Sequence, residues 1–122
     1  MAIQYEFRRV NDILWVQATG FDENLEDVKK YGLAIIEKAL AGRFRMILCD
    51  ERSLEYRLGT FDTFTAGAFV AEAAPRVAKV ALVCNARNIS DASFWETVVI
   101  NRGMEARVFK EIEAAQAWLL GD

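Results

Sequence analysis

Residues 43–51 read Arg-Phe-Arg-Met-Ile-Leu-Cys-Asp-Glu, a short apolar run between charged ends. Such a run is typical of a strand that is buried on both faces of a parallel sheet. Residues 77–84, Val-Ala-Lys-Val-Ala-Leu-Val-Cys, have the same character, and residues 106–109 form a shorter run. These three segments predict the parallel strands around which the rest of the chain is arranged.

The N-terminal segment predicts an antiparallel hairpin. Apolar and polar residues alternate over residues 3–7, which is the period of a half-buried strand. Asn11 and Asp12 mark a turn, and residues 13–19 predict the second strand, which Gly20 ends.

A helix is predicted to follow the hairpin. It begins after Asp22, Glu23 and Asn24, whose side chains favour a helix N-terminus. Its apolar residues recur at helical spacing and predict one buried face, made of Leu25, Val28, Gly32, Ile35, Ile36, Ala39 and Leu40. Gly42 is predicted to be the left-handed residue that caps the helix.

Three more helices are predicted over residues 60–73, 90–102 and 111–120. Thr60 is predicted to cap the first of them, and Pro75 to end it. Ser93 and Glu96 have the spacing of a capping box for the next helix, although Ser90 or Asp91 fits the cap as well.

The resulting order is β-β-α-β-α-β-α-β-α. Strands that alternate with helices imply right-handed crossovers and a mostly parallel sheet. The chain of 122 residues shows no linker or internal repeat. We therefore predict one α/β domain over residues 1–122, with a mixed, mostly parallel five-stranded sheet and four helices.

Composition narrows the function classes. The net charge is −3 and both signs are mixed along the chain, so no basic block predicts nucleic-acid binding. No apolar run is long enough to predict a membrane span, and no secretory leader is visible. Cys49 and Cys84 lack Cys-x-x-Cys spacing and are predicted to be buried free thiols. These features predict a cytoplasmic protein.

Histidine is absent from the sequence. Its absence excludes Ser–His and Cys–His nucleophile pairs and histidine-based zinc sites. No glycine-rich dinucleotide motif or P-loop lysine is present, so no cofactor or metal is predicted. Carboxylate and lysine chemistry stay open.

Three segments resemble the SpoIIAA-like group of the STAS superfamily (sulfate transporter and anti-sigma-factor antagonist). They are residues 42–51, residues 94–97 followed by 101–103, and residues 107–110 followed by 114–119. The resemblance covers essentially the whole chain, and it consists of core and cap positions. It implies a SpoIIAA-like fold that binds a regulatory protein.

Regulatory STAS domains are switched by phosphorylation of a hydroxyl at the start of the helix after the central strand. The resemblance implies a similar switch in this chain. The family has an Asp-Ser-(Ser/Ala)-Gly-like motif there. This chain reads Leu-Gly-Thr-Phe-Asp-Thr over residues 58–63, so Thr60 and Thr63 supply hydroxyls without the serine motif. The related SEC14-like domains bind lipids, which implies a small apolar ligand as an alternative.

Ligands of open α/β sheets gather where the strands end. The candidate site residues at that edge are Asp50, Ser53, Thr60, Asp62, Thr63 and Phe69. Asp50 and its neighbour Glu51 are predicted to be solvated charges that point to opposite faces of the sheet. Phe61 and Phe64 are predicted to face the core, and Phe69 to be the exposed ring. The alternative is that some of these rings line a pocket or a partner-binding face.

We expect a non-enzymatic regulatory domain that binds a protein partner. The alternative is a carrier or sensor of a small apolar or anionic ligand, which predicts a closed cavity between the second helix and the sheet. An enzyme would need at least two acids to converge in one cleft, out of Asp50, Glu51, Asp62 and Asp91. Trp15 is predicted on a half-open strand face, where it would support a homodimer through the hairpin.

Overall fold

An antiparallel hairpin forms one edge of the sheet, which confirms the prediction from alternation. The computed structural model describes residues 2–74 and 78–121. Strand β1 (Ile3–Val10) pairs with β2 (Ile13–Phe21) along its whole length. Asn11 adopts a left-handed conformation with φ 55° in the turn, which asparagine tolerates better than most residues.

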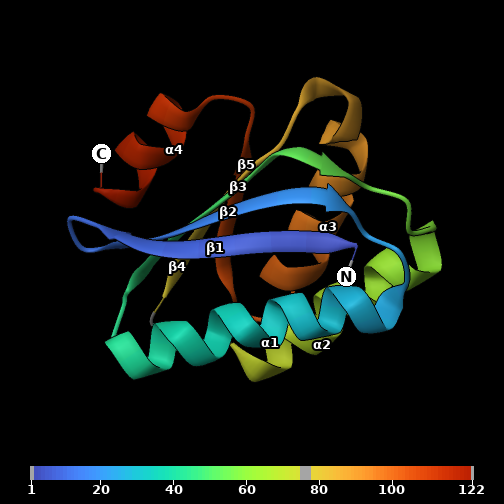
Figure 1. The fold of residues 1–122 in the computed structure, drawn as a ribbon, viewed down its shortest axis with the longest axis horizontal. Helices are drawn as coiled ribbons and strands as arrows, with labels where there is room; N and C mark the ends of the chain where they lie inside the picture. The colour runs from blue at the N-terminus through green and yellow to red at the C-terminus, as the bar shows by residue number, and fades with distance from the viewer. Residues whose placement is uncertain (1, 75–77, 122) are drawn as a thin grey trace.

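The parallel strands follow in the order β1-β2-β3-β4-β5 (Figure 1). Strand β3 (Met46–Glu55) lies between β2 and β4 (Lys79–Val83), and β5 (Glu105–Phe109) is the other edge. The predicted fold class is therefore confirmed. However, β3 is longer than predicted, because its last residues pair with the end of β2 beyond a register shift.

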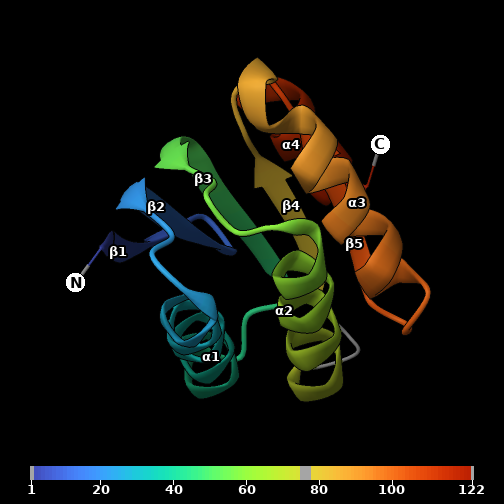
Figure 2. The ribbon, with the colours of Figure 1, turned by 90° about the vertical axis from the view of Figure 1, so that its right-hand side faces the viewer.

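The two faces of the sheet are covered unequally (Figure 2). Helices α1 (Leu25–Gly42), α2 (Thr60–Ala73) and α3 (Ile89–Ile100) lie on one side. A 3-10 turn over Ala86–Asn88 leads into α3. On the opposite face, α4 (Ile112–Leu119) packs through Ala115 and Leu119 on buried side chains of β2, β3 and β4.

Trp15 belongs to the face that α4 covers. It is only 8% exposed and packs with Leu48 and Leu119, so the predicted half-open strand face was wrong. The local pattern around Trp15 could not show this, because the helix that covers its strand face, α4, lies at the far end of the chain. Trp15 thus offers no exposed ring to a homodimer, and the homodimer itself stays an untested prediction.

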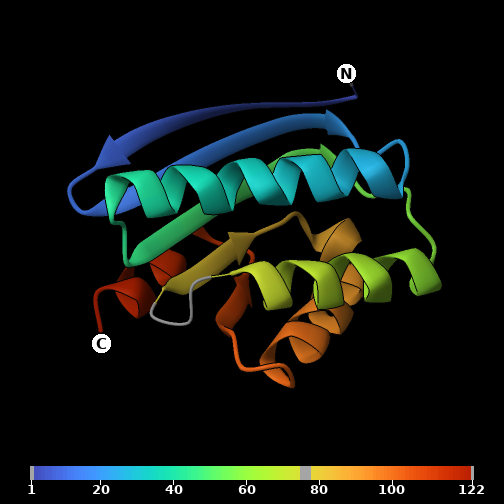
Figure 3. The same cartoon turned by 90° about the horizontal axis from the view of Figure 1, so that it is seen from below.

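Helix α2 packs between α1 and α3 rather than directly on the sheet (Figure 3). Two glycines allow these helices to come close. A Cβ on Gly32 would lie 2.8 Å from Val70, and one on Gly67 would lie 3.0 Å from Val98. The three helices therefore form one layer, in which α2 contacts mainly α1 and α3.

The buried face of α2 consists of its small residues, Ala66, Gly67 and Ala71. Phe61 is 78% exposed and Phe64 is also exposed, so the prediction that they face the core was wrong. Phe69, the predicted exposed ring, is half-buried, with Lys29 Nζ 5.0 Å from its centroid. Apolar residues occur on several sides of α2, so its sequence does not indicate which side is buried. The side with small residues is buried because only small residues let the neighbouring helices come close.

Two of the predicted helix caps are placed differently. Arg43, not Gly42, is the left-handed residue after α1, with φ 56°. Gly42 is needed for space instead, because a Cβ there would lie 2.5 Å from the Phe44 ring. At α2, Gly59 is the N-cap and Thr60 is the first helical residue, so Thr60 makes no cap hydrogen bond.

The predicted capping box of α3 was also wrong. The helix begins at Ile89, ahead of both Ser93 and its alternatives. The Glu96 carboxylate instead accepts a hydrogen bond from the Val108 backbone N–H at 2.7 Å, which ties α3 to β5. Pro75 and the predicted start of a strand at residue 77 lie outside the described residues. Leu40 in α1, predicted to be inward, is exposed.

Among the helices of the described residues, none combines the length and the apolar character needed to cross a membrane.

Candidate functional site

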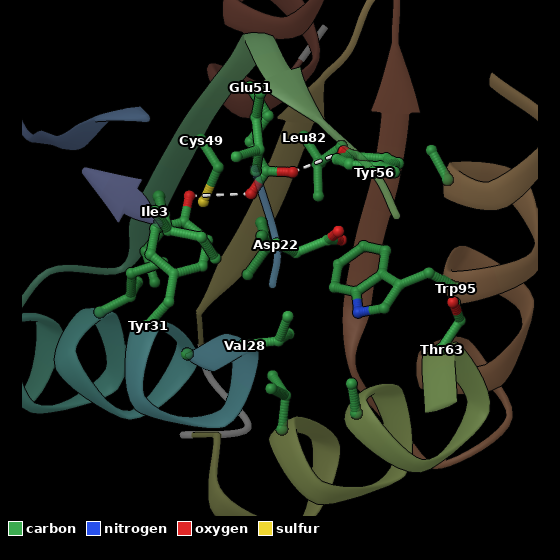
Figure 4. Close-up of a pocket in the computed structure, with 18 of the residues that line it drawn as sticks. Ile3, Asp22, Val28, Tyr31, Cys49, Glu51, Tyr56, Thr63, Leu82 and Trp95 are labelled. Carbon is green, nitrogen blue, oxygen red and sulfur yellow. Dashed lines mark hydrogen bonds between the residues drawn. The ribbon is translucent and has the colours of Figure 1, made fainter. Parts of the chain in front are cut away.

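A cavity of about 140 Å³ lies between the sheet and the layer of α1, α2 and α3 (Figure 4). Its position follows from the packing of α2 on its neighbouring helices. The walls are mostly aliphatic side chains from all three helices and from β3 and β4. The side chains that bring polar groups to it are Asp22, Tyr31, Glu51, Tyr56, Thr63 and Asp91. A cavity is thus present where the ligand-binding alternative predicted one, between the second helix and the sheet, but it is partly open and not closed as predicted.

Glu51 is the central polar group of this cavity. It lies on β3, is 6% exposed, and points from the sheet toward the helices. The Tyr31 hydroxyl from α1 donates to its Oε2 at 2.8 Å, and the Tyr56 hydroxyl donates to its Oε1 at 2.5 Å. Each carboxylate oxygen therefore has one tyrosine donor and retains further acceptor capacity.

The environment of Glu51 favours its neutral form. Burial raises the pKa of the Glu51 carboxyl, and the negative charges of Asp22 and Asp50 act in the same direction. The two tyrosine hydrogen bonds oppose this shift but do not cancel it. Burial and the nearby Glu51 charge also raise the pKa values of Tyr31 and Tyr56 well above their ordinary range. Both tyrosines therefore remain donors at neutral pH.

Two more carboxyl groups line the same cavity. Asp22 follows β2 and is buried, and its carboxylate accepts a hydrogen bond from the Arg57 backbone N–H. Burial raises the Asp22 pKa against this backbone hydrogen bond. Asp91 is exposed in the first turn of α3, and its charge further raises the Asp22 pKa. The enzyme alternative required at least two of Asp50, Glu51, Asp62 and Asp91 in one cleft, and Glu51 and Asp91 both line this cavity.

Asp50 lies on the opposite side of β3 from Glu51, as predicted for adjacent strand residues. It is only 2% exposed, so the prediction that this pair is solvated was wrong. Both acids are buried because β3 continues to Glu55 and carries them inside the sheet. The Arg52 guanidinium donates to the two Asp50 oxygens at 2.9 Å each. Burial would raise the Asp50 pKa, but these hydrogen bonds outweigh it and lower the pKa.

The other predicted site residues are scattered around the α2 end of the molecule. Thr63 lines the cavity, and its hydroxyl donates to the Gly59 carbonyl at 3.0 Å. Thr60 and Ser53 are exposed, while Asp62 is half-buried in the first turn of α2. Of the predicted set, only Thr63 reaches the cavity.

Sequence reasoning missed Tyr31, Tyr56, Asp22 and Trp95 as cavity residues. A signal was present for Tyr31, because it lies four residues before Ile35 and so shares the buried face of α1. No comparable local signal marks Tyr56, which follows the end of β3. Its role depends on where the chain turns after that strand.

The two cysteines are free and buried, as predicted. Cys49 lines the cavity beside Glu51, and its pKa is raised well above the ordinary value by burial and by the Glu51 charge. The same two causes, burial first, raise the pKa of Cys84 to about 11. Both thiols are therefore protonated at neutral pH and are poor nucleophiles.

Within residues 2–74 and 78–121, no group of three or more acidic, cysteine or histidine side chains is arranged to hold a metal ion. The cavity acids are spread among aliphatic walls instead.

Comparison with known proteins gives similarity at the level of structure. No protein-family model and no curated protein sequence matches the chain. A crystal structure of an anti-sigma factor antagonist from Mycobacterium paratuberculosis has a TM-score of 0.67 at 12% identity. An uncharacterized protein with a SpoIIAA-like fold from Shewanella loihica has a TM-score of 0.57 at 22% identity. Each similarity covers 97% of this chain and 94% of the other. The chain therefore has the SpoIIAA-like fold that its resemblance to the STAS superfamily implied.

Proposed function

We propose that this protein is a non-enzymatic regulatory domain that binds a protein partner through the start of α2. The observation that carries the proposal is the exposure of the Phe61 ring, which is 78% accessible in the first turn of that helix. A large aromatic ring that is exposed and does not pack in the protein's core is the type of side chain that anchors protein interfaces. The fold shared with an anti-sigma factor antagonist supports a regulatory role.

The surface around Phe61 has the composition of an interface. Phe64 lies three residues further along the same side of α2 and is also exposed, with Arg102 5.1 Å from its ring centroid. Exposed Thr60 and half-buried Asp62 provide a polar rim. We call Thr60, Phe61, Asp62 and Phe64 the α2 surface.

A phosphoryl group on Thr60 would be well accommodated. Thr60 is the first residue of α2, where the positive end of the helix dipole favours negative charge. The Thr63 hydroxyl, in contrast, is already bonded to the Gly59 carbonyl. Thr60 is thus our candidate for a regulatory switch at the α2 surface. The buried reduced cysteines fit action in the cytoplasm.

Phe61→Asp is expected to weaken partner binding about 30-fold or more, because an anchor ring contributes about 2 kcal/mol or more. The partner would first be isolated by cross-linking in the source cell and then titrated with purified protein. Leu120→Asp, at an exposed leucine after α4, is the matched control and should bind like wild type. Equal affinity of folded Phe61→Asp, or a wild-type protein without any specific partner, would contradict the proposal.

A second candidate function is the binding of a small ligand in the cavity. Its volume of about 140 Å³ supports this candidate. A cavity of ~150 Å³ is large enough to hold a benzene-sized molecule. The space lies under α2, whose contacts are with α1 and α3, so its walls belong to helices that could separate to admit a ligand.

Toluene is expected to raise the melting temperature of the wild-type protein by a few degrees through binding to the folded state. Ala66→Leu should abolish this shift, because Ala66 lines the cavity and the larger side chain occupies it. Ala117→Leu, at an exposed alanine of α4, is the control for added hydrophobic surface. A toluene shift that is absent in wild type, or equal in both leucine variants, would contradict cavity binding.

A further inference from the structure

The charge of the cavity wall is one-sided. Three carboxyl groups from separate parts of the chain line it: Asp22 after β2, Glu51 in β3 and Asp91 at the start of α3. Among the described lining residues, none is lysine or arginine. Two acids outside the cavity, Asp50 and Glu55, have the arginine partners Arg52 and Arg57. The cavity therefore carries negative charge on a mostly apolar wall.

Asp22 and Glu51 are both buried, and both line this cavity. The charge of Asp22 also raises the pKa of Glu51. Figure 4 shows both side chains directed into the cavity, with the rings of Tyr31, Tyr56 and Trp95 around it. Each Glu51 oxygen holds one tyrosine hydrogen bond and can accept another. Exposed Asp91 adds negative charge on the solvent side.

We propose that the cavity binds a small hydrophobic amine in its ammonium form, with the ammonium at Glu51 and Asp22 and the apolar body among the aliphatic walls. This inference rests on the second candidate function and assigns the class of its ligand. An ammonium compensates buried carboxylates with charge-assisted hydrogen bonds. Nearby aromatic rings also favour a cation. The anionic ligand that the sequence left open would instead meet like charges without a basic partner among the described walls.

Burial of the acids links this binding to pH. Burial raises the pKa values of Glu51 and Asp22, and an adjacent ammonium would lower them again. The amine therefore prefers the ionised carboxylates, and its affinity should fall as the pH drops through the raised Glu51 pKa. The affinity of a neutral ligand of the same shape should not fall as the pH drops, because it does not require ionised carboxylates.

Calorimetric titration with benzylamine, toluene and benzoate separates the relevant outcomes. Benzylamine is expected to bind about tenfold more tightly than toluene near neutral pH, and benzoate more weakly than either. Tighter binding of toluene than benzylamine would overturn the amine assignment while leaving cavity binding intact. Failure of all three probes would overturn cavity binding itself. Preferred binding of benzoate would reverse the charge assignment.

The variant Glu51→Gln provides the residue-level test, because it keeps the shape and removes the charge. It should lose the preference for benzylamine over toluene but still bind toluene. Asp62→Asn is the matched control, since Asp62 is an acid of α2 that is absent from the cavity wall. Circular dichroism would confirm folding of each variant. An unchanged benzylamine preference in folded Glu51→Gln would overturn the proposal.

Discussion

Replacement of both Tyr31 and Tyr56 by phenylalanine is expected to lower the free energy of unfolding by roughly 3–6 kcal/mol near neutral pH. The estimate follows from two hydrogen bonds to one buried carboxylate, at about 1.5–3 kcal/mol each. Without the two hydroxyls, the buried Glu51 carboxylate would lose the hydrogen bonds to both of its oxygens. Urea denaturation followed by circular dichroism would measure the loss.

The loss should depend on pH in a defined direction. The Glu51 pKa is raised in the folded state above its ordinary value of 4.5, so the buried charge is unfavourable above the raised pKa. As the pH falls through that value toward 4.5, the folded protein binds a proton and this unfavourable contribution disappears. The double variant should therefore be closer to wild type at acidic pH than at neutral pH.

Glu51→Gln in the double-phenylalanine background provides the control. It removes the charge that the tyrosines stabilise, so it should recover part of the lost stability at neutral pH and flatten the pH dependence. Asp22 would leave a residual slope of the same sign, because its pKa is raised as well. A loss that is independent of pH, and not relieved by Glu51→Gln, would mean that the tyrosines act only through packing.

Gly20→Ala is expected to destabilise the protein by roughly 3 kcal/mol or more. Gly20 has φ 91°, a backbone conformation that alanine adopts only with strain. In addition, an added Cβ would lie 2.1 Å from the Ala2 carbonyl oxygen, a backbone atom that cannot rotate away. That carbonyl accepts the hydrogen bond from the Phe21 N–H, so relief of the clash would open the end of the hairpin.

Gly59→Ala is the matched control for this prediction. Gly59 has an extended backbone with φ −73°, and a Cβ there would meet no atom within 4 Å. Its replacement should cost about 1 kcal/mol or less, as expected for alanine in place of an N-cap glycine. Chemical denaturation of both variants would compare them directly. Similar small losses at the two positions would show that the hairpin end adapts freely.

Most of the fold could be predicted because its signals are local. The alternation over residues 3–7, the apolar face of α1 and the strand at residues 46–49 each depend on residues close together in sequence. The strand–helix order then implied a mostly parallel sheet. Helix ends were less predictable, since Arg43 and Gly59 assume roles that local pattern assigned to Gly42 and Thr60.

The candidate site was harder to predict for two reasons. The acids Asp50 and Glu51 look like solvated strand ends until β3 is seen to continue past them. The aromatic residues of α2 look like core until the helix is seen to pack through Ala66, Gly67 and Ala71. In both cases the local sequence is compatible with either a buried or an exposed side chain. Segments far away in the sequence decide which of the two occurs.

Local spacing alone determined the hairpin, the helices and their order, since backbone hydrogen bonding and apolar periodicity act over a few residues. Only the tertiary structure decided that Glu51 meets two tyrosines in a cavity with Asp22. These groups come from β3, α1, the segment after β3 and the end of β2. Their desolvation and mutual repulsion exist only once these segments pack together, because each acid in the isolated chain is surrounded by water.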